Sequence, residues 1–330
     1  MKVILDAFGG DNAPIEIIKG AYAAVEESDV TVILCGDEEK IKKTMKDENI
    51  SSDRLLIHHC TEVIEGNDDP IKAVKHKKDS SIVSGLNLLK DGGGDVFISA
   101  GNTGALFTAA NLIIKRIKGV KRSALGIYLP SEKGPKLMLD SGANVTLSPE
   151  YINQLAVMGS VYFETDKGVK NPTVGLINIG IEETKGTENL VEAYNLLKEN
   201  SAINFKGNCE SRYILTGDFD VLVCDGFTGN IILKTIEGVS KTLMKGIKKV
   251  MTATLISKIC ALGLKKGMYE FKKQFDYKEY GATPIIGLRQ PVMKAHGSSD
   301  MKAIKNAILN CRTFVESDII ANIEKKIGAW

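Results

Sequence analysis

Several motifs that commonly identify an enzyme class are missing from this chain of 330 residues. No GxGxxG follows a strand pattern, no GxxxxGK precedes a serine or threonine, and no GxSxG occurs, which argues against dinucleotide, P-loop nucleotide and serine-hydrolase enzymes. The six cysteines form no CxxC and the four histidines have no metal-ligand spacing, so we expect reduced core thiols and no metal or cofactor. Apolar runs stay short of the roughly 18 to 20 residues of a membrane span, and no signal peptide is evident, which predicts a cytoplasmic protein.

The composition is that of a globular protein with many turns, at 43% hydrophobic and 25% charged residues with 32 glycines. The net charge of +2 is unevenly distributed. Residues 241–278 contain ten lysines and only two acidic residues, a local charge of +8, so the rest of the chain sums to −6. The basic charge is therefore concentrated in one segment.

The most informative stretch joins a buried strand to a helix through a glycine-rich turn, in residues 95–115. Residues 96–99 have a buried-strand pattern, Gly101 to Gly104 form the turn, and apolar residues at helical spacing follow. The first amides of such a helix have no internal partner, and the helix dipole favours negative charge. This turn is therefore a candidate anion site.

The same pattern returns 125 residues later, in residues 220–234. In the aligned stretches, Gly226, Thr228 and Gly229 match Gly101, Thr103 and Gly104. One such glycine turn is common in α/β proteins and is more often structural than functional. Two matched copies with polar strand ends favour a shared ligand crevice at the carboxyl ends of the strands.

Other predicted strand ends carry similar residues. The candidate substrate or phosphate-binding residues at these junctions are Gly9, Gly10, Asp11, Ser99, Gly101, Asn102, Thr103, Gly104, Asn144, Asp225, Gly226, Thr228, Gly229, Asn230 and Ser298. Lys185 follows the strand pattern of residues 173–179 and could neutralise an anionic ligand, although a loop lysine is more often solvated. His296 precedes a closing helix that we expect to have a serine cap and to run to Ile327; a lone histidine is more often structural.

Strands and helices alternate along the chain, which predicts a three-layer α/β/α fold with a mostly parallel sheet. We expect one catalytic domain over residues 1–330, with a helical protrusion at 238–279. Apolar residues near helical spacing from Leu255 to Phe275, with lysines between them, suit a basic amphipathic helix on an anionic bilayer, or a helix packed on its own core or a second subunit. The candidate membrane or carrier contacts are Leu255, Ile259, Leu262, Lys265, Lys266, Met268, Phe271 and Lys272.

Six segments together resemble the PlsX family of bacterial phosphate acyltransferases. They are DAFGGDNAP (6–14), SAGNTGAL (99–106), DSGAN (140–144), NIGIEETKG (178–186), CDGFTGNIILK (224–234) and HGSSD (296–300). The resemblance covers essentially the whole chain and implies a homodimer with a fold like isocitrate dehydrogenase and phosphotransacetylase. It also implies transfer of a fatty acyl group from acyl-carrier protein to inorganic phosphate, for phospholipid synthesis. The acyl phosphate would pass to a PlsY-like glycerol-phosphate acyltransferase, with this enzyme peripherally associated with the membrane.

The resemblance assigns roles to the candidates. Phosphate is a competent nucleophile, so such an enzyme has to hold the dianion, orient it on the thioester carbonyl and stabilise the oxyanion. We expect Lys185 to neutralise charge and His296 to orient a group or protonate the leaving thiolate. Carboxylates at the strand ends would repel phosphate, so we predict that they fix turn amides and lysine. These carboxylates are Asp6, Asp11, Asp140 and Asp225.

Two other functions stay open. A phosphotransacetylase-like enzyme acting on acyl-CoA would share the fold and the phosphate chemistry. A preference for acyl-carrier protein over acyl-CoA would distinguish the two enzymes. A non-catalytic lipid or membrane-surface binding protein would use the basic segment, but would leave five polar strand-end turns unexplained. We expect no nucleic-acid partner.

Overall fold

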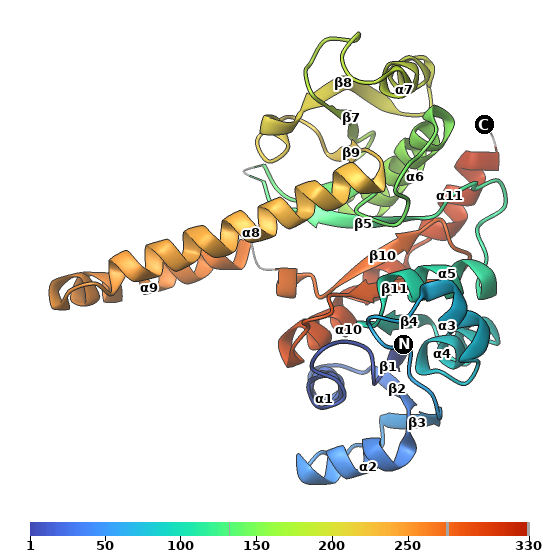
Figure 1. Cartoon of the computed structure of the whole chain (residues 1–330), viewed down its shortest axis with the longest axis vertical. Helices are drawn as coiled ribbons and strands as arrows, with labels where there is room; N and C mark the ends of the chain where they lie inside the picture. Colours follow the sequence, from blue (N-terminus) through green and yellow to red (C-terminus); the bar gives the residue numbers. More distant parts are fainter. Residues whose placement is uncertain (132, 275–276, 329–330) are drawn as a thin grey trace.

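The computed structural model describes residues 1–131, 133–274 and 277–328, but not the side chains of residues 272–277 (Figure 1). Its strands are β1 (Lys2–Asp6), β2 (Thr31–Gly36), β3 (Leu55–His59), β4 (Val96–Ser99), β5 (Ala124–Leu129), β6 (Lys136–Leu139), β7 (Thr173–Asn178), β8 (Asn204–Glu210), β9 (Val221–Val223), β10 (Ala282–Ile286) and β11 (Val292–Ala295).

Its α-helices are α1 (Ile15–Glu27), α2 (Glu38–Asp47), α3 (Pro70–His76), α4 (Ser81–Lys90), α5 (Thr103–Ile113), α6 (Pro149–Lys167), α7 (Glu188–Glu199), α8 (Gly226–Met251), α9 (Leu255–Gln274), α10 (Met301–Glu316) and α11 (Ile319–Gly328). Two short 3-10 helices, η1 (Ser211–Tyr213) and η2 (Tyr277–Glu279), connect them.

The described strands form one sheet in the order β3-β2-β1-β4-β11-β10-β5-β6-β9-β7-β8. Three neighbouring pairs in the middle are antiparallel: β11 with β10, β10 with β5, and β5 with β6. The other seven pairs are parallel, which confirms the predicted mostly parallel sheet. Because direction reverses three times across the middle, the two parallel groups point their carboxyl ends to opposite edges of the sheet.

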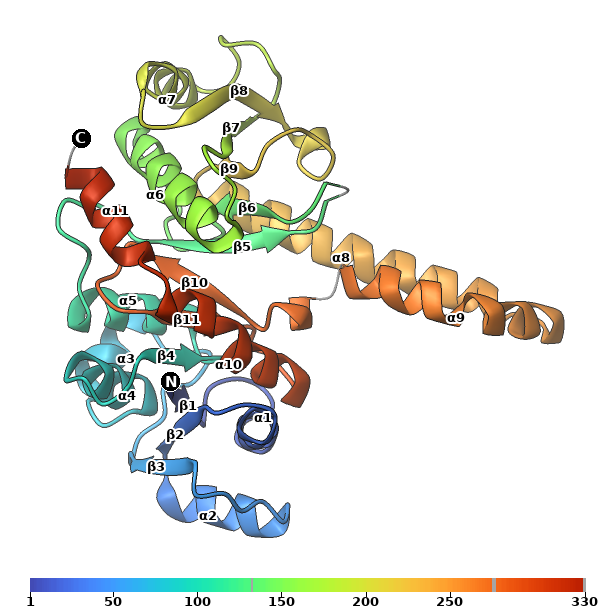
Figure 2. The ribbon, with the colours of Figure 1, turned by 180° about the vertical axis from the view of Figure 1, so that it is seen from behind.

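Helices cover both faces of the sheet, as the alternating pattern predicts (Figures 1 and 2). One core cluster contains Leu155 of α6 and Ile304 of α10, and a second contains Leu106 of α5. On β1, Leu5 belongs to the first cluster and Ile4 to the second, because successive side chains of a strand point to opposite faces. The three-layer α/β/α architecture is therefore confirmed.

Helices α8 and α9 form a hairpin that projects from the sheet (Figures 1 and 2). At 26 residues, α8 alone is about 39 Å long. This hairpin overlaps residues 238–279, where the sequence predicts a protrusion. The amphipathic character of α9 is not established: Leu255 and Leu264 are 75% and 59% exposed and lie half a turn apart around the axis of α9. The side chain of Lys272, and Phe275, lie outside the described residues. No helix in the described part of the chain is long and apolar enough to cross a bilayer.

The end of the chain differs from the prediction. It forms two helices, α10 and α11, because the backbone is extended at Ser317. Asp300, not a serine, caps α10, and its carboxylate accepts a hydrogen bond from the Ala303 amide at 3.0 Å. The cysteines are free thiols, buried in the core except for the exposed Cys260 of α9.

Gly229 offers a test of how closely α8 packs on the sheet. A Cβ at this position would lie 1.9 Å from the carbonyl oxygen of Asp140, which belongs to the backbone and cannot turn away. We expect Gly229→Ala to lower the free energy of unfolding by about 1 to 3 kcal/mol in chemical denaturation.

The matched control is Gly238→Ala on the same helix, where a new Cβ meets nothing within 4 Å. That change should raise stability by about 0.5 to 1 kcal/mol, because alanine restricts the unfolded chain. If both substitutions change the free energy of unfolding equally, the close contact between Gly229 and Asp140 does not affect stability.

Candidate active site

A pocket of about 460 Å³ lies over the antiparallel middle of the sheet, with α8 along one side. Leu125, Ile127 and Leu129 line it from alternate positions of β5, so they share one face of the strand. Leu233 and Ile236 line it from α8 at helical spacing. One wall of the pocket is therefore apolar and follows both elements.

Polar side chains gather on the other part of the pocket. Lys294 and His296 come from the end of β11, and Asn230 and Lys234 come from the first turns of α8. The Nζ atom of Lys234 lies 3.4 Å from Nε2 of His296, and 2.8 Å from a carboxylate oxygen of Glu237. The sequence places these residues far apart, and the crossing of α8 over the sheet brings them together.

Lys294 is the most strongly perturbed cation of the pocket. Burial lowers the pKa of its ammonium to about 8, repulsion from Lys234 adds to the decrease, and attraction to the buried Asp6 opposes it. Its Nζ donates a hydrogen bond to the carbonyl oxygen of Ala100 at 3.2 Å. At neutral pH this side chain is a desolvated positive charge, which attracts an anion more strongly than a solvated lysine does.

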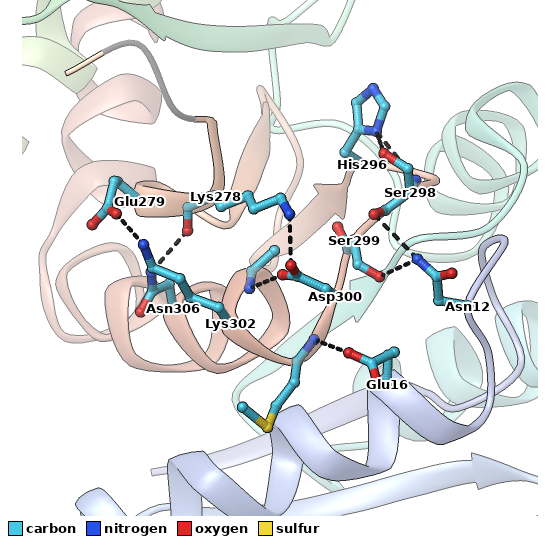
Figure 3. Close-up of polar contacts among 12 residues, drawn as sticks. Asn12, Glu16, Lys278, Glu279, His296, Ser298, Ser299, Asp300, Lys302 and Asn306 are labelled. Carbon is cyan, nitrogen blue, oxygen red and sulfur yellow. Dashed lines mark hydrogen bonds and ion pairs between the residues drawn. The ribbon is translucent and has the colours of Figure 1, made fainter. Parts of the chain in front are cut away.

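Figure 3 shows how the junction between β11 and α10 holds His296. The Ser298 amide lies 3.2 Å from Nδ1 of His296 and donates to it, so the proton of the neutral ring is on Nε2. The side chain of Asn12 donates to the carbonyl oxygens of Ser298 and Ser299 at 3.3 and 3.1 Å (Figure 3). Burial lowers the pKa of His296, and the charge of Lys234 lowers it further, which favours the neutral ring.

The first predicted anion turn is largely occupied by internal hydrogen bonds. Asn102 caps α5 by accepting from the Ala105 amide at 3.0 Å. Its Nδ2 donates to three carbonyl oxygens of the loop before α3, at 3.1 to 3.2 Å. The Gly101 amide donates to the hydroxyl of Ser99 at 3.0 Å. Only Thr103 of this turn lines the pocket.

Three of the four predicted strand-end carboxylates, Asp6, Asp140 and Asp225, hold turns, whereas Asp11 is exposed. Asp6 accepts from the Ser99 hydroxyl at 2.6 Å, and Asp225 caps α8 by accepting from the Thr228 amide at 2.8 Å. Asp140 accepts from the amides of residues 142–144 and from the side chain of Asn144. Burial raises the pKa of Asp6 and of Asp140, and these hydrogen bonds oppose the increase.

The structure brings four of the predicted site residues together around the pocket: Thr103, Gly226, Asn230 and His296. The others do not line it. They are Gly9, Gly10, Asp11, Ser99, Gly101, Asn102, Gly104, Asn144, Asp225, Thr228, Gly229, Ser298 and Lys185. Most of them shape the neighbouring turns. Lys185 is exposed on the loop after β7, where its backbone carbonyl accepts from Asn178 at 2.9 Å.

Sequence reasoning missed Lys294 and Lys234 as pocket residues. A signal for Lys294 was present, since a lysine inside the short apolar strand VMKA needs either an exposed edge or a buried anion. Among the described residues, no three histidine, cysteine, aspartate or glutamate side chains gather as metal ligands would.

Relatives of known name match the chain over nearly its full length. A family model described as "Fatty acid synthesis protein" matches residues 1–322. "Phosphate acyltransferase" of Clostridium tetani is 46% identical over 328 residues, covering 99% of this chain and 98% of the relative. The protein of the same name from Clostridium acetobutylicum is 45% identical over 328 residues, with 99% of each chain covered.

Solved structures with the same fold are more distant in sequence. A phosphotransacetylase from Streptococcus pyogenes aligns with a TM-score of 0.60 at 16% identity, covering 99% of this chain and 94% of its own. A branched-chain phosphotransacylase from Enterococcus faecalis aligns with a TM-score of 0.58 at 12% identity, covering 96% and 100%. At these identities the likeness establishes the fold alone. The family match and the full-length identities establish more: this chain belongs to the PlsX family of phosphate acyltransferases and is an acyltransferase.

Proposed function

We propose that this enzyme transfers a fatty acyl group from acyl-carrier protein to inorganic phosphate, giving acyl phosphate. The observation that carries the proposal is one pocket that combines two cations with a long apolar wall. Lys294 and Lys234 suit an anion, and the leucine and isoleucine side chains of β5 and α8 suit a hydrocarbon chain. Both substrates of the reaction therefore find complementary surfaces side by side.

In the proposed reaction, bound hydrogen phosphate attacks the thioester carbonyl directly. The new bond joins a phosphate oxygen to the acyl carbon, and the carbon–sulfur bond breaks when the tetrahedral intermediate collapses. The phosphate proton passes to the leaving thiolate, and the Nε2–H of His296, which stays on the ring, suits a hydrogen bond to that thiolate. The products are acyl phosphate and the free carrier thiol, so no oxidant or further reactant is needed.

Asn230 and Lys294 have complementary roles in this proposal. The side-chain amide of Asn230, on the first turns of α8, suits a hydrogen bond to the oxyanion of the intermediate or to a phosphate oxygen. Lys294 offsets the charge of phosphate with less competing water than an exposed lysine, since its side chain is partly buried. The turn carboxylates are already hydrogen-bonded, which limits their repulsion of the anion.

The first test is product formation by the purified protein with long-chain acyl-carrier protein and phosphate, trapping acyl phosphate with hydroxylamine. We expect phosphate-dependent product from the carrier substrate, and much less from the same acyl group on CoA. Product from CoA alone would favour a phosphotransacetylase-like enzyme. No product from either would favour the lipid-binding alternative.

The second test concerns the cation. Lys294→Ala should lower kcat/KM for phosphate by about 10² to 10³, because one desolvated charge contact is lost. In the wild type, KM for phosphate should rise between about pH 7 and about pH 9, as Lys294 loses its proton near its pKa of about 8. Phosphate gains charge over the same range, which alone would lower KM, so the sign of the change identifies lysine.

Lys185→Ala is the comparison for that experiment. Lys185 stays a predicted charge-neutralising residue, yet its side chain does not line the pocket, so we expect a smaller loss than for Lys294. Wild-type activity of Lys185→Ala would remove it from the mechanism. A pH-independent KM in the wild type, or full activity of Lys294→Ala, would contradict the role of Lys294.

We also propose that the protrusion makes peripheral contact with the membrane, near the predicted acceptor of the product. The exposed apolar residues of α9 include Leu262 at 71% and Phe271 at 45%, next to Lys265 and Lys266. Apolar side chains beside lysines suit an anionic bilayer. The same surface suits the second subunit of the predicted homodimer.

Measurements of vesicle binding and of oligomeric state distinguish contact with the membrane from contact with a second subunit. Leu262→Glu with Phe271→Glu should reduce sedimentation with anionic vesicles at least about tenfold, because two buried apolar contacts are replaced by charges. Thr235→Glu with Thr242→Glu, at two exposed polar positions of α8, adds the same number of negative charges and is the control. Intact vesicle binding by the double variant would refute membrane contact, and dissociation to a monomer would assign the surface to the second subunit.

A further inference from the structure

A second pocket, of about 520 Å³, shares no lining residue with the first and is strongly basic. Arg116, Lys121, Arg122 and Tyr151 line it, together with Gly119 and Val120. Its arginines and lysine belong to the connection between α5 and β5. We call Lys115, Arg116, Lys118, Lys121, Arg122 and Arg289 the basic cluster.

The connection is held rigidly, so the charges have defined positions. Ile117 and Val120 are 3% and 5% exposed and anchor it in the core, which directs the residues between them outward. Gln154 of α6 accepts from the Lys121 amide at 2.7 Å and donates to the carbonyl of Gly119 at 3.1 Å. Arg289 donates through Nε to the carbonyl of Arg116 at 3.0 Å.

The charges of the basic cluster are not neutralised within the described chain. None of its six members forms a salt bridge there, whereas Arg54, Lys77 and Arg312 elsewhere each pair with a carboxylate. The nearby Glu150 accepts instead from the hydroxyl of Ser148 at 2.5 Å. Six like charges on one surface repel each other and attract an acidic partner.

The basic cluster adjoins one end of the candidate active site. Ser123, next to Arg122, accepts through its carbonyl from the side chain of Asn144 at 2.8 Å. Leu125 lies two residues after Ser123, and Val145 directly follows Asn144. Both line the pocket of the candidate active site. A partner on the basic cluster would therefore contact the segment that leads into the wall of the pocket.

The protrusion projects on the opposite side of the molecule from the connection between α5 and β5 (Figures 1 and 2). A flat bilayer at the tip of α8 and α9 would not reach the basic cluster at the same time. This geometry disfavours lipid as the partner of the cluster. Arginines in a pocket with one tyrosine instead suit carboxylates on a folded protein surface, which the guanidinium can bind with two parallel hydrogen bonds.

We infer that the basic cluster docks the acidic carrier protein that delivers the acyl thioester, so that the carrier and the membrane contact different ends of the enzyme. The inference rests on the proposed function for the identity of the partner. Opposite charges would steer the carrier to the cleft and accelerate its association. The apolar protrusion is then left for the bilayer or the second subunit.

The test is the double variant Arg116→Glu with Arg122→Glu. We expect KM for acyl-carrier protein to rise at least about tenfold, with kcat little changed, because association depends on the charges. The dissociation constant for labelled carrier protein, from fluorescence anisotropy, should rise by a similar factor, and wild-type binding should weaken as salt is added. The same acyl group on pantetheine, which has no protein surface, should react equally with both enzymes.

Lys170→Glu with Lys206→Glu is the control, since it makes the same charge change at exposed positions near β7 and β8. It should leave KM and carrier binding unchanged, and thermal unfolding should match the wild type for both double variants. Unchanged carrier affinity of the Arg116 and Arg122 variant would overturn the inference. Loss of binding to anionic vesicles by the same variant, with carrier binding intact, would also overturn the inference. If the wild type makes no acyl phosphate, the proposed function fails, and anisotropy still decides whether the cluster binds the carrier.

Discussion

The three antiparallel pairings in the middle of the sheet determine where this protein can bind its substrates. In a wholly parallel sheet, every helix would begin at the same edge, and one row of turns would form the site. Here β4 and β9 point in opposite directions, so the turns that follow them approach one pocket from different sides, and Thr103 and Gly226 both line it. The pocket lies instead across β10 and β5, and α8 must cross the sheet to complete it.

That arrangement explains the electrostatics of the pocket. The end of β11 contributes Lys294 and His296, while the start of α8 contributes Asn230 and Lys234. The carboxylates of the same turns are turned inward and saturated by hydroxyl and amide donors. Lys294 and Lys234 face the cavity, where Glu237 pairs with Lys234, whereas the turn carboxylates stay in the scaffold.

The sequence was sufficient to predict the fold and part of the candidate active site. The buried-strand pattern and the helical spacing of residues 95–115 predict β4 and α5, because those elements depend on local burial. The role of Asn102 could not be predicted, since a cap and a ligand-binding amide use the same side chain. Lys294 depends on strand order, which places its strand beside β4 although nearly two hundred residues separate them. Lys185 was favoured because it follows the end of β7. Although β7 is the parallel neighbour of β9, Lys185 is exposed and does not line the pocket.

One continuous helix, α8, is both a wall of the pocket and the core of the protruding arm. No loop or hinge interrupts it between Asn230 and Met251. The arm is therefore a direct continuation of the first turns of α8, which contribute Asn230, Lys234 and part of the apolar wall to the pocket. Contacts made by the arm and the apolar wall of the pocket therefore belong to one unbroken backbone segment.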